Sequence, residues 1–582
     1  MTTQSRRLPI SIRRREFTIR VDGQVLPRSE HLLSLWINNS VNRIATARLV
    51  FQDGSASNGD FPLSNADTFK PGAEVEFLAG DSSETELLFK GVVEGHKLKV
   101  RSGAPARLIV DCKHHAVRMT VARHSAYFFN QSDSDVISGL FEQAGIPTDV
   151  SSTSVTHKQL VQFHATEWDF CLMRAQANGL VVLSKEDGTI EVKSPDATGD
   201  PVITLQYGAT ILDMDLELDS CHQYKAVKTV SWDMANQALI EKEAADPGLN
   251  SPGNIGSAEL SEVMEQDEFR QQHSQVSEDE LQAWADALWH YSQANRVNGR
   301  LKCEGIGSVK VGDVITLSGV GERFNGNAYV SAVRHDYDLS QGWKTHFQLG
   351  GIEVLDDGKG DASASPSAGL LPSVNGLQIG VVVSNEDPDG EFRVRVRMPL
   401  VDNDDEGTWA RVSCLDAGEE RGFFFRPEVG DEVVLGFLED DPRQAVVLGM
   451  LHSSAKPAPA EGSDDNHEKL LQTRSRMKLS FDDENIVMKL ETPEGNSIVL
   501  SEQDEAIVLT DQHGNSITLN ADGITLQSAS ALNLKADTDI KLESSASIEI
   551  KAGSELKLEG SAGAELSSSA TTRISGSLVN IN

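Results

Sequence analysis

The chain has 582 residues, too many for one ordinary core, so three or four structural units are expected. Its formal net charge of −36 comes from 88 acidic against 52 basic residues, which disfavours binding to nucleic acid or to anionic membrane surfaces. The five cysteines are far apart and form no CxxC pair, so no disulfide framework is predicted. No signal peptide or membrane-spanning run is predicted either, because no apolar stretch approaches the about 20 residues of a membrane span.

In residues 1–355, segments with a strand pattern alternate with segments with a helix pattern. The segments "EFTIRVDGQVL" and "ELLFKGVVEGHKLKVR" alternate apolar and polar residues, which is typical of strands. Helices are predicted over 132–146, 166–180 and 277–291. The last opens with Ser277 and Glu280 at capping-box spacing. We expect a mainly β unit with helical insertions over these residues.

The middle of the chain predicts a small barrel between two linkers. Residues 356–376 and 453–467 are rich in small, polar and proline residues, which is typical of linkers. Between them, residues 377–452 hold five short apolar runs separated by the turn segments "NEDPDG", "DNDDE" and "PEVG". Five strands at this short spacing predict a closed barrel of OB type.

Residues 468–582 consist of short strand units that become strictly periodic. "GNSIVL" at 495–500 returns as "GNSITL" at 514–519. From residue 524 onward a pair of mostly apolar residues, two positions apart, recurs every eight residues up to the pair 572/574. Because residues i and i+2 of a strand face the same way, each eight-residue unit offers one small apolar face that cannot bury itself. Either one chain uses three units per coil, or three chains each supply one unit per level around a common axis.

The barrel segment resembles the OB-fold of the VgrG family, the spike proteins of type VI secretion systems and related contractile injection systems. The resemblance rests on many positions in one register. They lie in "DPDG" (387–390), "WAR" (409–411), "GFF" (422–424), "PEVGDEV" (427–433), "DPR" (441–443) and "VVLG" (446–449). Upstream, "VNRIATARLVFQDG" and "GDVITLSGVGERFNGNAYVSAVRHDYD" look like the hub part of the same family.

The resemblance implies a homotrimeric central spike with a mainly β fold. Residues 1–355 would form a phage-hub-like domain of two β-barrel subdomains with helical insertions, followed by an OB-fold collar and a C-terminal trimeric β-helix needle. Its implied partners are the inner tube and hub adaptor proteins, baseplate proteins, a PAAR-like tip protein and effector cargo, and its target is a membrane that it punctures. It implies assembly in the bacterial cytoplasm and a place in an extracellular or secreted contractile particle. The bare spike looks most like the extracellular phage-tail-like particles, with a type VI spike close behind.

The sequence predicts no catalytic, cofactor-binding or metal-ligating residue. The segment "DCKHH" offers Asp111, Cys112, His114 and His115, but it continues a strand, so its side chains should point to opposite faces. His335 and His346 are interpreted as structural histidines. The acidic segments 402–406 and 439–441 lack the spacing of a calcium loop and are interpreted as solvated turns.

The sequence leaves two alternatives to the spike. A single-chain β-solenoid enzyme acting on polysaccharides would need clustered catalytic acids or basic residues. The acids of the needle instead alternate with lysines, as in charge pairing on a solvated surface. The acids are Glu543, Glu549, Glu555 and Glu559, and the lysines are Lys541, Lys551 and Lys557. A trimeric adhesin would end in a globular head. No lysozyme domain fits between Leu451 and Lys469, and no effector domain is expected after the repeat.

Trp284 and Trp289 are predicted to lie in the helix core and at an interface. The "FFF" segment at 423–425 is predicted to pack either in the trimer collar or in the monomer core.

Overall fold

The structure is a computed structural model. It describes residues 16–27, 31–80, 85–233, 238–249, 251–263, 265, 268–273, 276–353, 371–374, 376–402 and 404–581. The chain forms two compact units, Met1–His452 and Ser453–Asn582. Most of the predicted linker 356–376 lies outside the described residues. Among the described residues, the model contains no helix with the length and apolar character that crossing a membrane would require.

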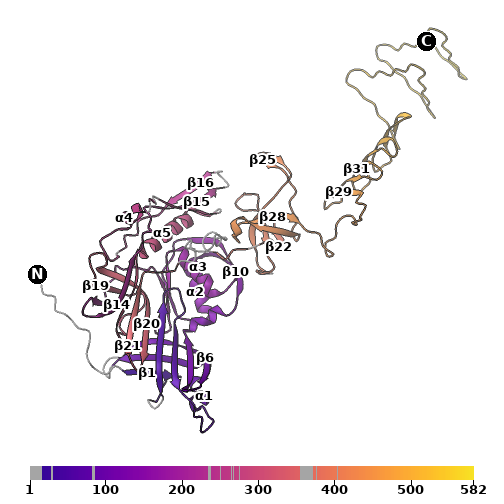
Figure 1. Ribbon diagram of the computed structural model, residues 1–582. Coiled ribbons are helices and arrows are strands. Elements are labelled where there is room, and N and C mark those ends of the chain that lie inside the picture. The colour runs from indigo at the N-terminus through magenta and orange to yellow at the C-terminus, as the bar shows by residue number, and fades with distance from the viewer. Residues whose placement is uncertain are drawn as a thin grey trace. The chain divides into compact units, whose positions relative to one another are not determined.

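The first unit is built on a 13-stranded sheet (Figure 1). Its main path runs β14-β18-β21-β20-β3-β4-β7-β6-β5-β1-β2, and β13 joins it through β19, which pairs with β20. The strands are β1 (Glu16–Val21), β2 (Gln24–Val25), β3 (Leu32–Ser40), β4 (Thr46–Gln52), β5 (Glu74–Gly80), β6 (Thr85–Arg101), β7 (Ala104–Lys113), β13 (Ile203–Gln206), β14 (Ile211–Leu218), β18 (Val297–Glu304), β19 (Val314–Ser318), β20 (Gly326–Asp338) and β21 (Gly342–Leu349).

This sheet encloses two apolar cores. One gathers around Phe51 and Phe77 from β4 and β5. The other gathers around Val330 and Phe347 from β20 and β21. Because β3 and β20 pair directly, the backbone pairing is continuous from one core to the next. The division of residues 1–355 into two barrel subdomains therefore stays a prediction, since the strands form one connected sheet.

The three predicted helices are confirmed as α2 (Asp133–Gln143), α3 (Glu167–Ala177) and α5 (Glu278–Ala294). Each begins where a Ser or Thr side chain accepts a hydrogen bond from the backbone N–H three residues on, which satisfies an otherwise unpaired donor. The remaining elements of the unit are α1 (Pro62–Asn65), α4 (Ser257–Val263), β8 (His124–Ser132), β9 (Thr148–Val150), β10 (Thr156–Ala165), β11 (Val181–Ser184), β12 (Ile190–Lys193), β15 (Val227–Asp233), β16 (Ala238–Glu243) and β17 (Phe269–His273).

The predicted five-stranded barrel is confirmed, and it is closed in the order β22-β23-β24-β28-β27. The "DPDG" turn has a structural role, because the Asp387 carboxylate accepts bonds from the Arg393 guanidinium at 2.8 Å. Gly407 is required before β24, since its φ is +79° and a Cβ there would lie 2.2 Å from the Val396 carbonyl oxygen. The strands are β22 (Gln378–Ser384), β23 (Val394–Arg397), β24 (Thr408–Val412), β27 (Glu432–Phe437) and β28 (Ala445–Met450), with the small hairpin β25 (Ala417–Gly418) and β26 (Arg421–Gly422) beside them.

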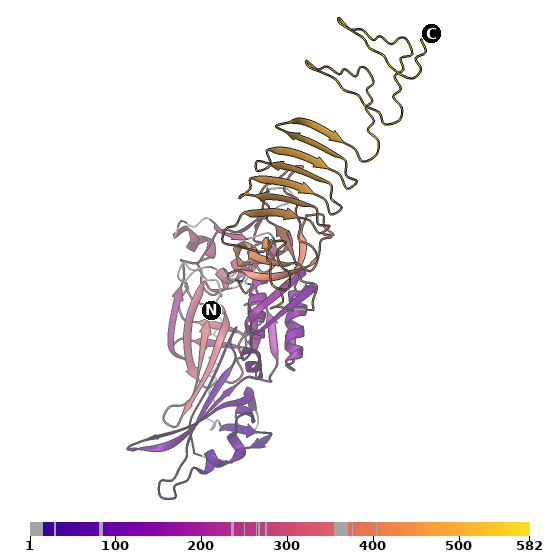
Figure 2. The ribbon, with the colours of Figure 1, turned by 90° about the vertical axis from the view of Figure 1, so that its right-hand side faces the viewer.

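The second unit begins with a seven-stranded antiparallel sheet whose strands follow one another as successive rungs (Figure 2). The strands are β29 (Glu468–Gln472), β30 (Lys478–Asp482), β31 (Val487–Glu491), β32 (Ser497–Ser501), β33 (Ala506–Thr510), β34 (Ser516–Asn520) and β35 (Gly523–Gln527). Only the first of the eight-residue units, with Ile524 and Leu526, lies in a strand; residues 528–581, which are all described, contain none.

Candidate functional site

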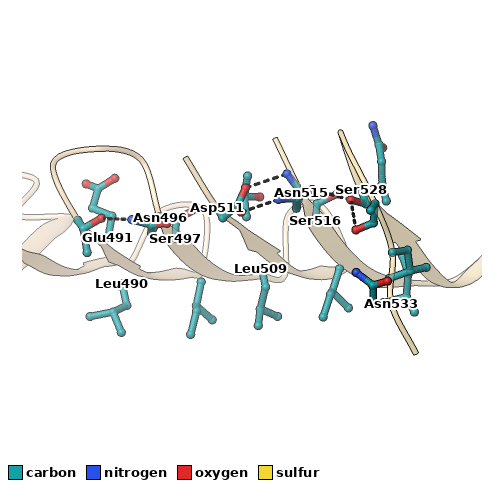
Figure 3. Close-up of a pocket in the computed structure, with 18 residues that line it drawn as sticks. Leu490, Glu491, Asn496, Ser497, Leu509, Asp511, Asn515, Ser516, Ser528 and Asn533 are labelled. Atoms are coloured by element: carbon teal, nitrogen blue, oxygen red, sulfur yellow. Dashed lines mark hydrogen bonds between the residues drawn. The ribbon is translucent and has the colours of Figure 1, made fainter. Parts of the chain in front are cut away.

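One face of the β29–β35 sheet carries two rows of apolar side chains. Each of β30–β35 supplies two residues two positions apart, and β29 supplies one. The register places these residues directly opposite their counterparts on the next strand. The first row is Leu471, Leu479, Leu490, Ile498, Leu509, Ile517 and Leu526, and the second is Phe481, Met488, Leu500, Ile507, Leu519 and Ile524. Figure 3 shows Leu490 and Leu509 of the first row pointing to the same side of the ribbon.

These apolar rows are exposed in the single chain. Leu490 and Leu526 are each 50% exposed, and Met488 is 40% exposed. Residues of the opposite, more polar face, such as Val499 and Ser501, are covered to a greater degree. A soluble protein rarely leaves so long an apolar face in water, so this face is built to be covered by another surface.

The repeated "GNS" motif lies in the turns beside the apolar rows, where its asparagine side chain makes hydrogen bonds. Asn515 donates a hydrogen bond from its amide to Asp511, and its carbonyl oxygen accepts one from Ser528 Oγ at 2.9 Å, which holds the chain as it leaves β35 (Figure 3). Asn496 occupies the equivalent position and donates to Thr492 Oγ1. The hydrogen bonds from Asn515 lower the pKa of Asp511, which keeps this turn acid charged.

The eight-residue units beyond Gln527 leave their apolar pairs in solvent. Ile540 and Leu542 are 54% and 68% exposed, and Leu556 and Leu558 are 55% and 78% exposed. A three-sided coil made by one chain would bury these side chains in its own interior. Residues 528–581 do not form such a coil, so the unit's apolar pairs remain available to other chains.

A second feature of the first unit is a buried ionic network. The Asp133 carboxylate at the start of α2 accepts hydrogen bonds from Arg174 at 2.5 and 2.9 Å and from Asn178 at 2.7 Å. His157 Nε2 lies 3.0 Å from Asp133, and its Nδ1 lies 3.8 Å from Glu280 at the start of α5.

The network continues into the OB barrel through Arg443. Its guanidinium lies 2.7 Å from Glu280 and 3.0 Å from Asp441, and all three side chains are largely buried. Burial by itself raises the pKa of Glu280, but Arg443 and His157 outweigh it and lower that pKa. The network therefore ties the hub helices to the barrel by charges that must remain paired.

The prediction that residues 439–441 form a solvated turn is wrong for Asp441. Glu439 is exposed and Asp440 is half-buried, but Asp441 is fully buried. Its carboxylate accepts hydrogen bonds from the backbone N–H and guanidinium of Arg443. Arg174 and Arg443 were also missed as network residues. The available signal was that Arg174 lies at helical spacing from Phe170, Cys171 and Ala177, on the apolar face of the helix.

The residues weighed for metal binding lie apart. Asp111 pairs with Arg48 at 2.5 Å on one face of β7, whereas Cys112 is buried on the other. His335 and His346 lie on neighbouring strands, but His335 faces Thr345 and His346 faces Arg334, so they point to opposite sides of the sheet. Within the described part of the chain, no cluster of three or more His, Cys, Asp or Glu side chains could hold a metal ion.

The "FFF" segment is exposed in the single chain. Phe423, Phe424 and Phe425 are 50%, 74% and 52% exposed, so they do not belong to the monomer core. Trp284 is buried in a core cluster with Leu281, and Trp289 is partly buried in a separate cluster with Ala285. The predicted interface role stays a prediction.

Three family models match the chain. The Alg8 N-terminal domain model matches residues 12–338. The model of the type VI secretion system and phage-baseplate injector OB domain matches residues 378–452, which hold the closed barrel. The model of the phage baseplate V C-terminal trimerisation domain matches residues 485–582, which hold most of the exposed apolar rows.

Individual relatives agree with these models. Over 368 residues the chain is 22% identical to the type VI secretion system spike protein VgrG1b of Pseudomonas aeruginosa, covering 57% of this chain and 47% of the relative. It is 31% identical over 129 residues to the spike protein VgrG3 of Vibrio cholerae, covering 19% of this chain and 12% of the relative. The match thus spans less than half of either relative's length. A chain of the Francisella PdpA–VgrG complex has the same fold, with a TM-score of 0.51, 10% identity and coverage of 88% of this chain and 80% of that one.

The hub sheet, the OB barrel and the unpaired apolar repeat together define a modular β-structured protein of the injector-spike class. The chain belongs to the Alg8 N-terminal domain family, whose model covers more than half of its length. With its OB and trimerisation domains it is a VgrG-like spike protein, related to those of type VI secretion systems and phage baseplates.

Proposed function

We propose that the chain assembles as a homotrimer and forms the central spike of a contractile injection machine, joining the inner tube to a membrane-piercing tip. The observation that carries this proposal is the exposed apolar face of residues 471–574. Three copies wound around one axis would bury that face in a common interior and leave no free strand edges along the needle. The match to a trimerisation domain supports the same arrangement.

The spike acts mechanically and not as an enzyme. Contraction of a surrounding sheath supplies the work, and this chain supplies stiffness, symmetry and docking surfaces. One matched relative is named actin cross-linking toxin VgrG1, but the match spans only 12% of that protein. We therefore assign no toxin activity to this chain on the basis of that match. The relatives named as spike proteins support the mechanical role.

The proposed partners follow from this role. The hub would dock on the inner tube, on hub adaptors and on baseplate proteins, and the end of the needle would carry a PAAR-like tip protein or effector cargo. The spike would assemble in the bacterial cytoplasm and leave the cell as part of an extracellular or secreted particle. In the Francisella complex a VgrG chain is bound to PdpA, which supports a spike that holds a second protein.

The test is the native mass of the full-length protein and of a version ending at residue 467. A trimer of the 63.1 kDa chain that dissociates more readily after truncation supports the intertwined needle. A full-length monomer would overturn the proposal. A trimer of unchanged stability would retain the homotrimer but overturn the claim that the needle holds it together.

A further inference from the structure

The outward side chains of the eight-residue units form two rows of alternating charge. Between each pair of apolar positions lies one outward residue, and successive units place there Lys541, Glu549, Lys557, Glu565 and Arg573. One position after each apolar pair, successive units place Lys535, Glu543, Lys551 and Glu559. Both rows change sign at every step, without exception.

Within one chain the charges also pair along a unit. Lys551 lies 2.5 Å from Glu549, and Lys557 lies 2.5 Å from Glu559. These pairs are exposed and join residues two positions apart, so each contributes little by itself. Each pair joins one residue of the first row to one residue of the second row within the same unit. Such pairs do not explain why the charge changes sign from one unit to the next.

The alternating charges of successive units come into contact when three chains wind around one axis. This arrangement rests on the proposed function. With threefold symmetry, each level holds the same unit of all three chains, one on each face. A winding chain moves to the next face at the next level. The strand directly above a given unit on the same face is therefore the following unit of a neighbouring chain, and parallel strands lie about 4.8 Å apart.

In that register every neighbouring pair in the two rows has opposite signs. Lys541 of one chain would lie beside Glu549 of the next, and Glu549 beside Lys557 of the third. A slip of one chain by one whole unit keeps all apolar pairs pointing inward, so the core alone cannot exclude it. The slip places like charges side by side, such as Lys541 with Lys557, and like charges directly opposite one another are destabilising.

We infer that the two alternating rows of charge set the register of the three chains in the needle, by pairing each unit with the following unit of a neighbouring copy. The apolar pairs hold the chains together but repeat too regularly to choose between registers one unit apart. The charges repeat every two units, which is the period needed to reject that slip.

Disulfide trapping tests this register directly. The variant Lys541→Cys/Glu549→Cys places two thiols on adjacent strands of different chains, at a separation that a disulfide spans. Mild oxidation is expected to link most chains into a covalent trimer, seen on a non-reducing denaturing gel. Lys541→Cys/Lys557→Cys is the matched control and is expected to stay unlinked, as is the parent chain with its five native cysteines.

Charge reversal then tests the cause. Glu543→Lys, added to Lys541→Cys/Lys557→Cys, should raise cross-linking between these two positions, because the registered arrangement then places like charges beside Lys535 and Lys551. Lys541→Cys/Glu549→Cys leaves seven charges in the two rows. Reversing all seven keeps the alternation and should leave cross-linking of the 541/549 pair unchanged.

The outcomes separate this inference from the function that it rests on. A native trimer in which Lys541→Cys/Lys557→Cys cross-links as readily as the 541/549 pair would overturn the register and leave the trimer standing. Cross-linking at 541/557 that Glu543→Lys leaves unchanged would show that something other than charge sets the register. A monomer by native mass would overturn both proposals.

Discussion

Glu280 serves two functions at the residue scale. Its backbone N–H donates to the Ser277 cap, as the capping-box spacing predicts, but its side chain points away to the Arg443 guanidinium. The local pattern therefore identified the start of α5 and missed what the carboxylate does. A buried charge with this many partners is costly to leave unpaired, so Glu280 is expected to matter more for stability than any other acid in the first turn of α5.

The variant Glu280→Gln is expected to lower the free energy of unfolding of the first unit by about 3 kcal/mol at pH 7, because Arg443 loses one of two buried carboxylates. The pKa of Glu280 is lowered in the folded protein, so its contribution is complete above the unfolded value of about 4.3 and is lost as pH falls through the folded value. The deficit of the variant should therefore shrink below about pH 4. Chemical unfolding of the chain ending at residue 467, followed across pH, measures it.

The matched control is Glu278→Gln in the same helical turn. Glu278 pairs with Lys242 but is 63% exposed, so its loss should cost less than about 1 kcal/mol. Equal effects of the two substitutions would mean that the buried network does not tie the hub to the barrel.

At the scale of elements, the second unit separates two kinds of strand. In β29–β35 the antiparallel hairpins satisfy backbone hydrogen bonds within one chain, so these strands form without a partner. The later units form no strands within the chain. Adjacent units joined by only a few residues cannot pair in parallel, so parallel pairing of neighbouring units there needs a second copy. This difference explains why the same apolar pattern produces strands before residue 527 and none after it.

The variant Ile548→Asp is expected to weaken the assembled trimer by more than about 2 kcal/mol per chain, since each copy loses a buried side chain and buries a charge. Ser545→Asp, three residues earlier on a turn, adds the same charge outside the proposed interior and should change little. Calorimetric melting of the full-length trimer measures both. Similar melting temperatures for the two variants would contradict an interior position for Ile548.

At the scale of the whole molecule, exposed apolar surface is found in both units. The strands of the needle carry one part, and the barrel carries another at Phe423, Phe424 and Phe425. The net charge of −36 per chain opposes the approach of three copies, so assembly needs enough apolar burial to offset this repulsion. We expect the phenylalanines to contribute to that burial in a trimeric collar.

The variant Phe424→Ser, made in the chain ending at residue 467, is expected to raise the dissociation constant of any remaining trimer by about tenfold or more, because a central aromatic side chain is lost from the interface. Sedimentation over a range of concentrations measures it. Leu339→Ser is the control, because Leu339 is 69% exposed on the turn between β20 and β21, away from the barrel. An equal effect of both substitutions would contradict the collar.

The sequence by itself determined every feature whose physical basis is local. Caps at Ser132, Thr166 and Ser277 act over three residues, the strands of the barrel alternate with period two, and the needle repeats every eight residues. These patterns located three helices, five barrel strands and the candidate interface. The alternating charges of the last units can likewise be found in the sequence.

Only the tertiary structure decided which distant groups meet. Glu280 and Arg443 are 163 positions apart, and no local period links them. Asp441 lies in an acidic turn that its sequence makes look solvated, yet the fold buries it against Arg443. The exposure of Phe424 and of the apolar rows was settled in the same way, since burial depends on which surfaces the folded chain brings together and a sequence pattern states only which surfaces are apolar.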